Sequence, residues 1–242
     1  MARRIGVLGG ISHESTARYY GLIHEGYYRR RGDLHYPEVV VFSLDFQRFT
    51  DLEDRGDREA YVGYIMEGVR ALERAGADLV VMAANSPHAV FEEVEERATV
   101  PVISIAEVAA DEAERLGLRT LLLLGIKFTM RSDFYQRVCG RRGIGVVTPS
   151  EGEQDEIDRI IFDELVLGVF RDESRRRILE IMSGYDVDGV ILGCTELPLL
   201  IGRGDAKVHL LDTLELHVEA ALDYSLSRSQ TTPGQKIDQG VP

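Results

Sequence analysis

The chain has 242 residues, of which 44% are hydrophobic and 29% are charged, and its formal net charge is -13 at pH 7. This size and composition are typical of one large or two small globular α/β domains, and the negative charge argues against nucleic acid or an anionic membrane as a partner. No apolar run approaches the roughly 20 residues that cross a bilayer, and residues 1–10 lack a signal-peptide layout. The two cysteines, Cys139 and Cys194, lie in different contexts, which indicates a reducing compartment. We therefore expect a cytoplasmic protein.

Apolar runs of strand length alternate with segments of helical pattern along most of the chain. The expected strands cover residues 4–10, 38–43, 80–84, 100–105, 119–125, 145–148, 190–193 and 208–211. The expected helices cover residues 12–31, 57–75, 87–97, 106–116, 128–139, 156–168, 173–182, 195–200 and 214–226. This alternation predicts an α/β fold with parallel sheets flanked by helices. We expect a first domain of residues 1–105 with 212–226, a second domain of residues 106–211, and a loose tail at 227–242.

The segment around Cys194 carries the clearest chemical signal. The run from Val190 to Leu192 predicts a strand buried on both faces, and Gly193 ends it. Cys194 then follows at the carboxyl end of the strand, where open α/β sheets place their chemistry. A helix that opens at Thr195 would favour the thiolate through the partial positive charge of its N-terminus. A buried structural cysteine is the alternative, because free cysteine is among the most buried residues.

A second copy of this pattern occurs in the first half of the chain. The segment from Asp78 to His88 aligns without a gap with the segment that starts at Asp188. Asn85-Ser86 falls opposite Thr195-Glu196, and Ala84 falls opposite Cys194. The repeat predicts two related halves that face one cleft, with a thiol on one side and a methyl group on the other.

Residues near the other strand ends are candidates for substrate contacts. Gly9-Gly10 lacks the third glycine of a dinucleotide fingerprint, so it more readily lets backbone approach a small anionic group. Arg48 follows the second strand and is either a clamp for a substrate carboxylate or a solvated loop arginine. His88 is either a structural residue at a helix start or a base that reaches the cleft.

Several kinds of site lack their sequence signals. The histidines are scattered, so no metal is expected. The chain also lacks a nucleophile elbow, a phosphate P-loop and a lysine placed for a pyridoxal Schiff base. What remains is a thiolate that acts as a base or adds to the substrate. Asn85, Ser86 and Thr195 can bind the carboxylate of a small amino-acid or carboxylic-acid substrate.

From about Ile5 to about Tyr224 the chain resembles the aspartate/glutamate racemases, which are cofactor-independent amino-acid racemases. The segments that carry the resemblance are residues 8–16 (LGGISHEST), Asn85-Ser86-Pro87-His88, Phe128-Thr129-Met130, Phe134-Tyr135, residues 164–168 (ELVLG) and residues 193–198 (GCTELP). The resemblance implies two pseudo-symmetric α/β domains with the active site in the cleft between them, usually in a homodimer. It also implies two opposed cysteines that act as acid and base on the substrate Cα, with no cofactor.

The resemblance also implies roles for individual residues. Cys194 would be the catalytic thiol of the second domain. The residues implied to bind or surround the substrate are Asn85, Ser86 and Thr195 for its α-carboxylate, together with Ser12, Gln47 or Arg48, His88, Lys127, Thr129 and Glu196. The substrate would be aspartate, glutamate or a broader range of amino acids.

Ala84 departs from the family pattern, because it occupies the place of the first catalytic thiol. A methyl group neither donates nor accepts a proton, and three explanations are open. Another donor can act there, such as Ser86, His88 or water. The protein can be a single-thiol decarboxylase or lyase of the arylmalonate type. Ala84 can also be an engineered Cys→Ala change. The non-enzyme alternative is a pseudoenzyme that binds a small carboxylic acid.

Overall fold

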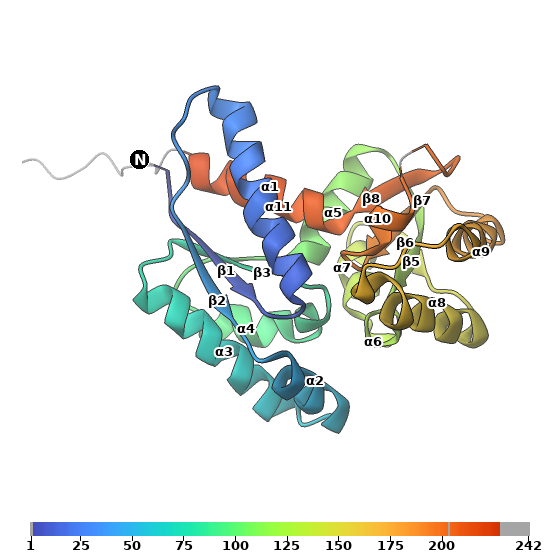
Figure 1. Ribbon diagram of the computed structural model, residues 1–242, viewed down its shortest axis with the longest axis horizontal. Coiled ribbons are helices and arrows are strands. Elements are labelled where there is room, and N and C mark those ends of the chain that lie inside the picture. The colour runs from blue at the N-terminus through green and yellow to red at the C-terminus, as the bar shows by residue number, and fades with distance from the viewer. Residues whose placement is uncertain (1, 203, 228–242) are drawn as a thin grey trace, which may run out of the picture.

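Two parallel four-stranded sheets form the frame of the protein in the computed structural model, which describes residues 2–202 and 204–227 (Figure 1). The first sheet has the order β2-β1-β3-β4 and the second has the order β6-β5-β7-β8. The strands are β1 (Ile5–Gly9), β2 (Val39–Ser43), β3 (Leu79–Met82), β4 (Val102–Ile103), β5 (Thr120–Gly125), β6 (Gly145–Val147), β7 (Gly189–Gly193) and β8 (His209–Asp212). The second half therefore repeats the strand order of the first, which confirms the predicted α/β fold.

Helices cover both faces of each sheet. In the first half they are α1 (His13–Arg31), α2 (Phe46–Arg55), α3 (Arg58–Arg74), the 3-10 helix η1 (Ser86–Val90) and α4 (Phe91–Arg97). In the second half they are α5 (Ile105–Arg115), α6 (Lys127–Arg131), α7 (Phe134–Gly140), α8 (Glu151–Asp163), the 3-10 helix η2 (Leu165–Leu167), α9 (Asp172–Ser183) and α10 (Leu197–Leu200). The last helix, α11 (Thr213–Leu226), returns to pack against α1 and α5 and so ties the halves together (Figure 1).

The strands are apolar along their length because both faces of each sheet are buried. In β1, Ile5 and Val7 face α1 and α11 and share a cluster with Leu222. Leu8 points to the opposite face and packs in a cluster with Val69 of α3. This alternation follows from the two-residue period of a strand, and it explains why an uninterrupted apolar run marks these segments in the sequence.

The structure differs from the expected elements in three places. Residues after β2 form α2 instead of a loop, because the Asp45 side chain caps the helix by accepting from the backbone N–H of Arg48 at 2.7 Å. The expected helix over 128–139 is split into α6 and α7. The expected helix at 156 begins earlier, where Ser150 and Glu153 form a capping box.

Two other expectations concern the C-terminal tail and membrane-spanning segments. Apart from Ser227, the predicted tail at 227–242 lies outside the described residues. Among the helices of the described ranges, none is long and apolar enough to cross a membrane.

The carboxyl ends of the central strands bring the repeated segments together. β3 and β7 hold equivalent places beside β1 and β5, and Ala84 and Cys194 follow them. Gly125 and Gly193 lie side by side at the ends of β5 and β7. A Cβ atom on Gly125 would lie 2.8 Å from the Gly193 carbonyl oxygen, so the approach of the two strands at this point requires glycine.

Candidate active site

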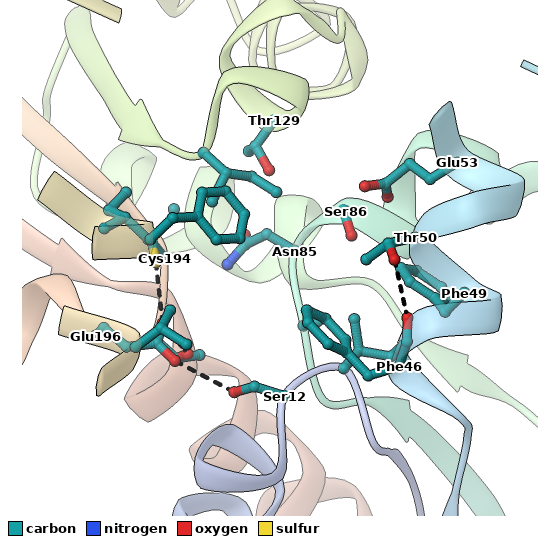
Figure 2. A pocket seen from close by; sticks show the side chains of 18 residues that line it. Ser12, Phe46, Phe49, Thr50, Glu53, Asn85, Ser86, Thr129, Cys194 and Glu196 are labelled. Atoms are coloured by element: carbon teal, nitrogen blue, oxygen red, sulfur yellow. Dashed lines mark hydrogen bonds between the residues drawn. The ribbon is translucent and has the colours of Figure 1, made fainter. Parts of the chain in front are cut away.

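A pocket lies between the two halves at the carboxyl ends of β1, β3, β5 and β7 (Figure 2). Its non-atom space is about 600 Å³, a figure that includes the solvent at its open mouth. The lining residues are Ile11, Ser12, Phe46, Phe49, Thr50, Glu53, Ala84, Asn85, Ser86, Ile126, Thr129, Ile161, Phe162, Val166, Gly193, Cys194, Thr195 and Glu196. Both halves of the repeat therefore contribute to one pocket.

Eight of the residues singled out in the sequence line this pocket: Ser12, Ala84, Asn85, Ser86, Thr129, Cys194, Thr195 and Glu196. Four others lie outside the lining: Gln47, Arg48, His88 and Lys127. The Gln47 amide donates to Asp51 at 2.9 Å on the surface of α2. Lys127 forms an ion pair with Asp155. A substrate contact by any of these four stays a prediction from the resemblance.

Arg48 is held on the outer side of α2. Its guanidinium lies over the ring of Tyr64, 4.0 Å from the ring centroid, and it pairs with Glu67 at 3.4 Å. The side chain is 57% exposed. The arrangement is that of a solvated arginine stacked on an aromatic ring.

Cys194 is buried in the pocket wall beside a carboxylate. Its thiol donates to Oε2 of Glu196 at 3.0 Å, and the same oxygen accepts from the Thr195 hydroxyl at 2.7 Å. The Ser12 hydroxyl donates to Oε1 of Glu196 at 3.3 Å, so the first half of the chain also helps to hold this carboxylate. The side chain of Cys194 is only 8% exposed.

These surroundings disfavour the thiolate at rest. Burial raises the pKa of the Cys194 thiol well above its ordinary value, and the charge and hydrogen bond of Glu196 raise it further. The backbone N–H groups of Glu196 and Leu197 act in the direction expected of a helix N-terminus and lower this pKa, but burial and the Glu196 carboxylate outweigh them. α10 has only four residues, and a negative charge contacts the sulfur directly. The thiol must pass its proton to a partner before it can act as a base, and Glu196 is placed to accept it.

Across the pocket from Cys194 lie Glu53 of α2 and Ser86, which follows β3 (Figure 2). Ala84 and Asn85, which precede Ser86 in the chain, also line the pocket. The Glu53 carboxylate accepts from the Tyr61 hydroxyl at 2.9 Å, and the Ser86 hydroxyl lies close enough to lower the Glu53 pKa. Burial raises the pKa of Glu53 above its ordinary value, although both hydroxyl donors act against that rise. Sequence reasoning missed Glu53 because it did not predict α2.

Asn85 connects the two halves beneath the pocket. Its side-chain oxygen accepts from the Tyr135 hydroxyl at 2.7 Å, and its amide donates to Oγ1 of Thr213 at 3.2 Å. Thr213 in turn donates to the backbone carbonyl of Leu192 in β7 at 2.9 Å. All four residues are buried. This chain of hydrogen bonds fixes the end of β3 relative to the end of β7, and with it the distance between the two walls.

His88 lies behind the Ala84 wall, not in the pocket. Its ring is 1% exposed, and Nδ1 lies 3.0 Å from the Ala84 carbonyl oxygen. Burial, followed by the neighbouring His217, lowers the pKa of His88 to about 3, so the ring is neutral at physiological pH. His88 is therefore a structural residue in this arrangement.

Most of the other lining residues are apolar, and the two charged residues of the whole lining are both acidic. Ile11, Phe46, Phe49, Ile126 and Phe162 are among the apolar side chains, and Glu53 and Glu196 supply the charge. Arg18 lines an adjoining groove, where it donates to the Thr195 carbonyl. Within the described ranges, no group of three or more histidine, cysteine or acidic residues could hold a metal ion.

Comparisons with known proteins all relate this chain to amino-acid racemases. A model of the family described as Asp/Glu/Hydantoin racemase matches residues 8–221. The broad specificity amino-acid racemase RacX of Bacillus subtilis is 22% identical over 212 residues, which cover 86% of this chain and 92% of that protein. Among solved structures, a putative Asp/Glu racemase from Yersinia pestis has a TM-score of 0.86 and 34% identity, with coverage of 93% of this chain and 100% of that one.

A second solved structure, an aspartate racemase homologue from Pyrococcus horikoshii, has a TM-score of 0.81 and 37% identity, with coverage of 92% and 99% of the two chains. The family match and these relatives span nearly all of the described residues, including both sheets and the pocket between them. The chain therefore belongs to the Asp/Glu/hydantoin racemase family and is an isomerase of the amino-acid racemase type.

Proposed function

We propose that this protein inverts an amino acid at Cα without a cofactor and that the Cys194 thiol is the acid and base on one face. The observation that carries the proposal is the Cys194–Glu196 pair. A buried thiol at the carboxyl end of a strand donates to a carboxylate 3.0 Å away, inside a pocket that both halves of the chain line. A pair of this kind can form a thiolate when substrate binds and recover the thiol afterwards.

The reaction follows from the position of this pair. Glu196 accepts the thiol proton, and the Cys194 sulfur removes the proton from the substrate Cα. The electron pair left on Cα is delocalised into the α-carboxylate, which the backbone N–H of Ser86, the hydroxyl of Thr195 and the amide of Asn85 stabilise by hydrogen bonds. Delivery of a proton to the opposite face of Cα then gives the other enantiomer.

The lining favours a range of amino acids broader than aspartate and glutamate. An acidic substrate side chain would enter a pocket whose charged lining residues, Glu53 and Glu196, are both carboxylates. Arg48 and Lys127, the two cations expected to bind a side-chain carboxylate, are engaged with Glu67 and Asp155 outside the lining. Apolar neighbours suit a neutral side chain, because it can leave water without burying a charge that has no partner.

A single-thiol decarboxylase is the second candidate, and Ala84 is the observation that favours it. When a malonate-type acid loses carbon dioxide, the resulting carbanion is protonated from one face, so an enzyme for this reaction needs only one thiol. Such an enzyme would release carbon dioxide from a malonate-type acid and would leave the configuration of amino acids unchanged. A binding protein would show a ligand-dependent rise in melting temperature with neither reaction.

The test is exchange of the α-proton in D2O, followed by NMR for both enantiomers of a panel of neutral and acidic amino acids. Cys194→Ala should abolish inversion, together with exchange of the enantiomer whose α-proton faces Cys194. Cys139→Ala is the matched control, because Cys139 is fully buried in α7 and does not line the pocket, and it should retain exchange. Full exchange by Cys194→Ala would refute the proposed function.

A further inference from the structure

The Ala84 wall of the pocket needs a proton donor if Cα is to be inverted, and the structure offers one. We propose that the Ser86 hydroxyl exchanges a proton with the Ala84 face of Cα and that Glu53 is the carboxyl group that supplies and recovers this proton. The inference rests on the proposed racemase function, which leaves the second donor unassigned. It makes Ser86 a catalytic residue and Glu53 a residue that acts through it.

The geometry places these two groups together on the correct wall. Ser86 lies two residues beyond Ala84, at the start of η1, and both Ser86 and Glu53 line the pocket. The Ser86 hydroxyl lies close enough to the Glu53 carboxylate to lower its pKa, and the Tyr61 hydroxyl donates to the same carboxylate at 2.9 Å. Figure 2 shows Glu53 and Ser86 on the side of the pocket opposite Cys194 and Glu196.

The internal repeat supports the same assignment. Ala84 and Ser86 stand where the second half has Cys194 and Glu196, so the first wall has lost the thiol and the carboxylate together. α2 supplies a carboxylate, Glu53, to this wall, and the Ser86 hydroxyl lies beside it in place of the thiol. Each wall then holds one carboxylate with a proton donor near it.

Other groups on this wall are not available for the role. His88 is buried behind the wall and outside the lining. Thr50 lines the pocket, but its hydroxyl donates to the backbone carbonyls of Phe46 and Gln47 at 3.1 and 3.0 Å. Tyr61 is 4% exposed and donates to Glu53. Ser12 also lines the pocket, but its hydroxyl donates to Glu196 beside Cys194. On the Ala84 wall, Glu53 and Ser86 are thus the pair able to pass a proton to the substrate.

The proton transfers balance in both directions. After Cys194 has removed the α-proton, the Ser86 O–H bond breaks and a C–H bond forms on the Ala84 face of Cα. The Glu53 carboxyl group gives its proton to the Ser86 oxygen in the same step and becomes a carboxylate. The reverse sequence removes the α-proton of the other enantiomer, with Glu53 as the final acceptor. The raised pKa of Glu53 keeps its acid form accessible closer to neutral pH than for an exposed glutamate.

The test separates exchange from inversion with Glu53→Gln, which keeps the size of the side chain and an acceptor for Tyr61. Asp54→Asn is the matched control, because it removes the same charge from the next position of α2, which is exposed and outside the lining. In D2O we expect the inversion rate of Glu53→Gln to be lower by about 100-fold or more, which is the usual effect of removing a general acid–base group. The same variant should still incorporate deuterium into one enantiomer through Cys194. Asp54→Asn should invert at nearly the rate of the unaltered protein.

Two further readouts distinguish proton transfer from a structural role. Ala84→Cys should restore inversion in the Glu53→Gln background, since it returns a thiol to the same wall. The inversion rate of the unaltered protein in the direction that starts at Cys194 should fall as pH rises through the Glu53 pKa, and Glu53→Gln should abolish that fall. Ser86→Ala should reproduce the loss of inversion.

Equal inversion by Glu53→Gln and Asp54→Asn would overturn the inference, and so would an equal loss of exchange and inversion in Glu53→Gln. Both results leave the Cys194 proposal intact. If the unaltered protein exchanges the α-proton of no amino acid in the panel, the racemase function itself is refuted, and the assignment of Ser86 and Glu53 with it.

Discussion

Glu196→Gln should lower the pKa of the Cys194 thiol by at least one unit. The Glu196 oxygen that accepts the thiol hydrogen lies 3.0 Å from the sulfur. Repulsion between a thiolate and a carboxylate at this distance is about 1.4 kcal/mol in a medium as polar as water and about 5.5 kcal/mol at an effective dielectric constant of about 20. These energies correspond to about one to four pKa units. Glutamine retains an acceptor of the same shape, so the substitution isolates the charge.

The assay is the pH dependence of alkylation by iodoacetamide, because only the thiolate reacts. It is run in a Cys139→Ser background, which removes the second thiol, whose pKa burial raises to about 11. The midpoint of the alkylation profile should move to lower pH in Glu196→Gln and should stay in place in Asp54→Asn, whose charge lies outside the pocket lining. An unchanged or higher midpoint in Glu196→Gln would refute the account of the Cys194–Glu196 pair.

Three further predictions concern the frame of the pocket. Tyr135→Phe leaves the buried Asn85 oxygen without its donor and should cost about 1–3 kcal/mol in urea unfolding, with a loss of activity; unchanged stability would contradict this. Gly125→Ala should destabilise by about 1–3 kcal/mol in the same assay, because the new methyl group meets the Gly193 carbonyl oxygen, and a neutral result would contradict the close approach. Burial lowers the pKa of His217 to about 4, which is below its value in the unfolded chain. Protonation of His217 therefore favours unfolding, and this residue should contribute a loss of about 2–3 kcal/mol in the free energy of unfolding between pH 7 and about pH 4.5. His217→Gln should make this loss smaller, and an unchanged pH dependence would contradict the assignment.

The sheets and the Cys194 wall are readable from the sequence because their signals are local. A short apolar run marks a strand buried on both faces, and this signal predicts both β3 and β7, of which β7 ends in glycine. The gapless repeat then placed Ala84 opposite Cys194, and both line one pocket in the structure. These predictions need no knowledge of how distant segments meet.

α2 was missed although its sequence contains a signal. Phe46, Phe49, Thr50 and Glu53 follow a spacing of three, four and seven residues, which places them on one face of a helix, and all four line the pocket. Asp45 ahead of them is a favourable N-cap. No helix is predicted here from the sequence, and Arg48 is considered only as a clamp or a loop arginine, so Glu53 is missed together with the helix.

Side-chain ends are harder to predict than backbone positions. Arg48 is a sequence neighbour of the lining residue Phe49, but its guanidinium lies over Tyr64 and beside Glu67, both of which come from α3. Lys127 begins α6 beside the lining residue Ile126 and turns to Asp155 of α8. A long flexible side chain lies where its partners are, and those partners are known only once the helices have packed.

The two walls of the pocket carry different acid–base groups, and thermodynamics limits how this difference can affect the rates of the reaction. A thiol faces Cα on one side, and on the proposed account a hydroxyl backed by Glu53 faces it on the other, so exchange from the two faces should depend differently on pH. The two enantiomers nevertheless have equal free energies in water, and kcat/KM must therefore be the same in both directions at every pH. The asymmetry of Cys194 and Ser86 must then appear as compensating differences in kcat and KM, and as unequal rates of deuterium incorporation into the two enantiomers. Unequal kcat/KM values for a purified pair of enantiomers would mean that the measured reaction is not a simple racemisation.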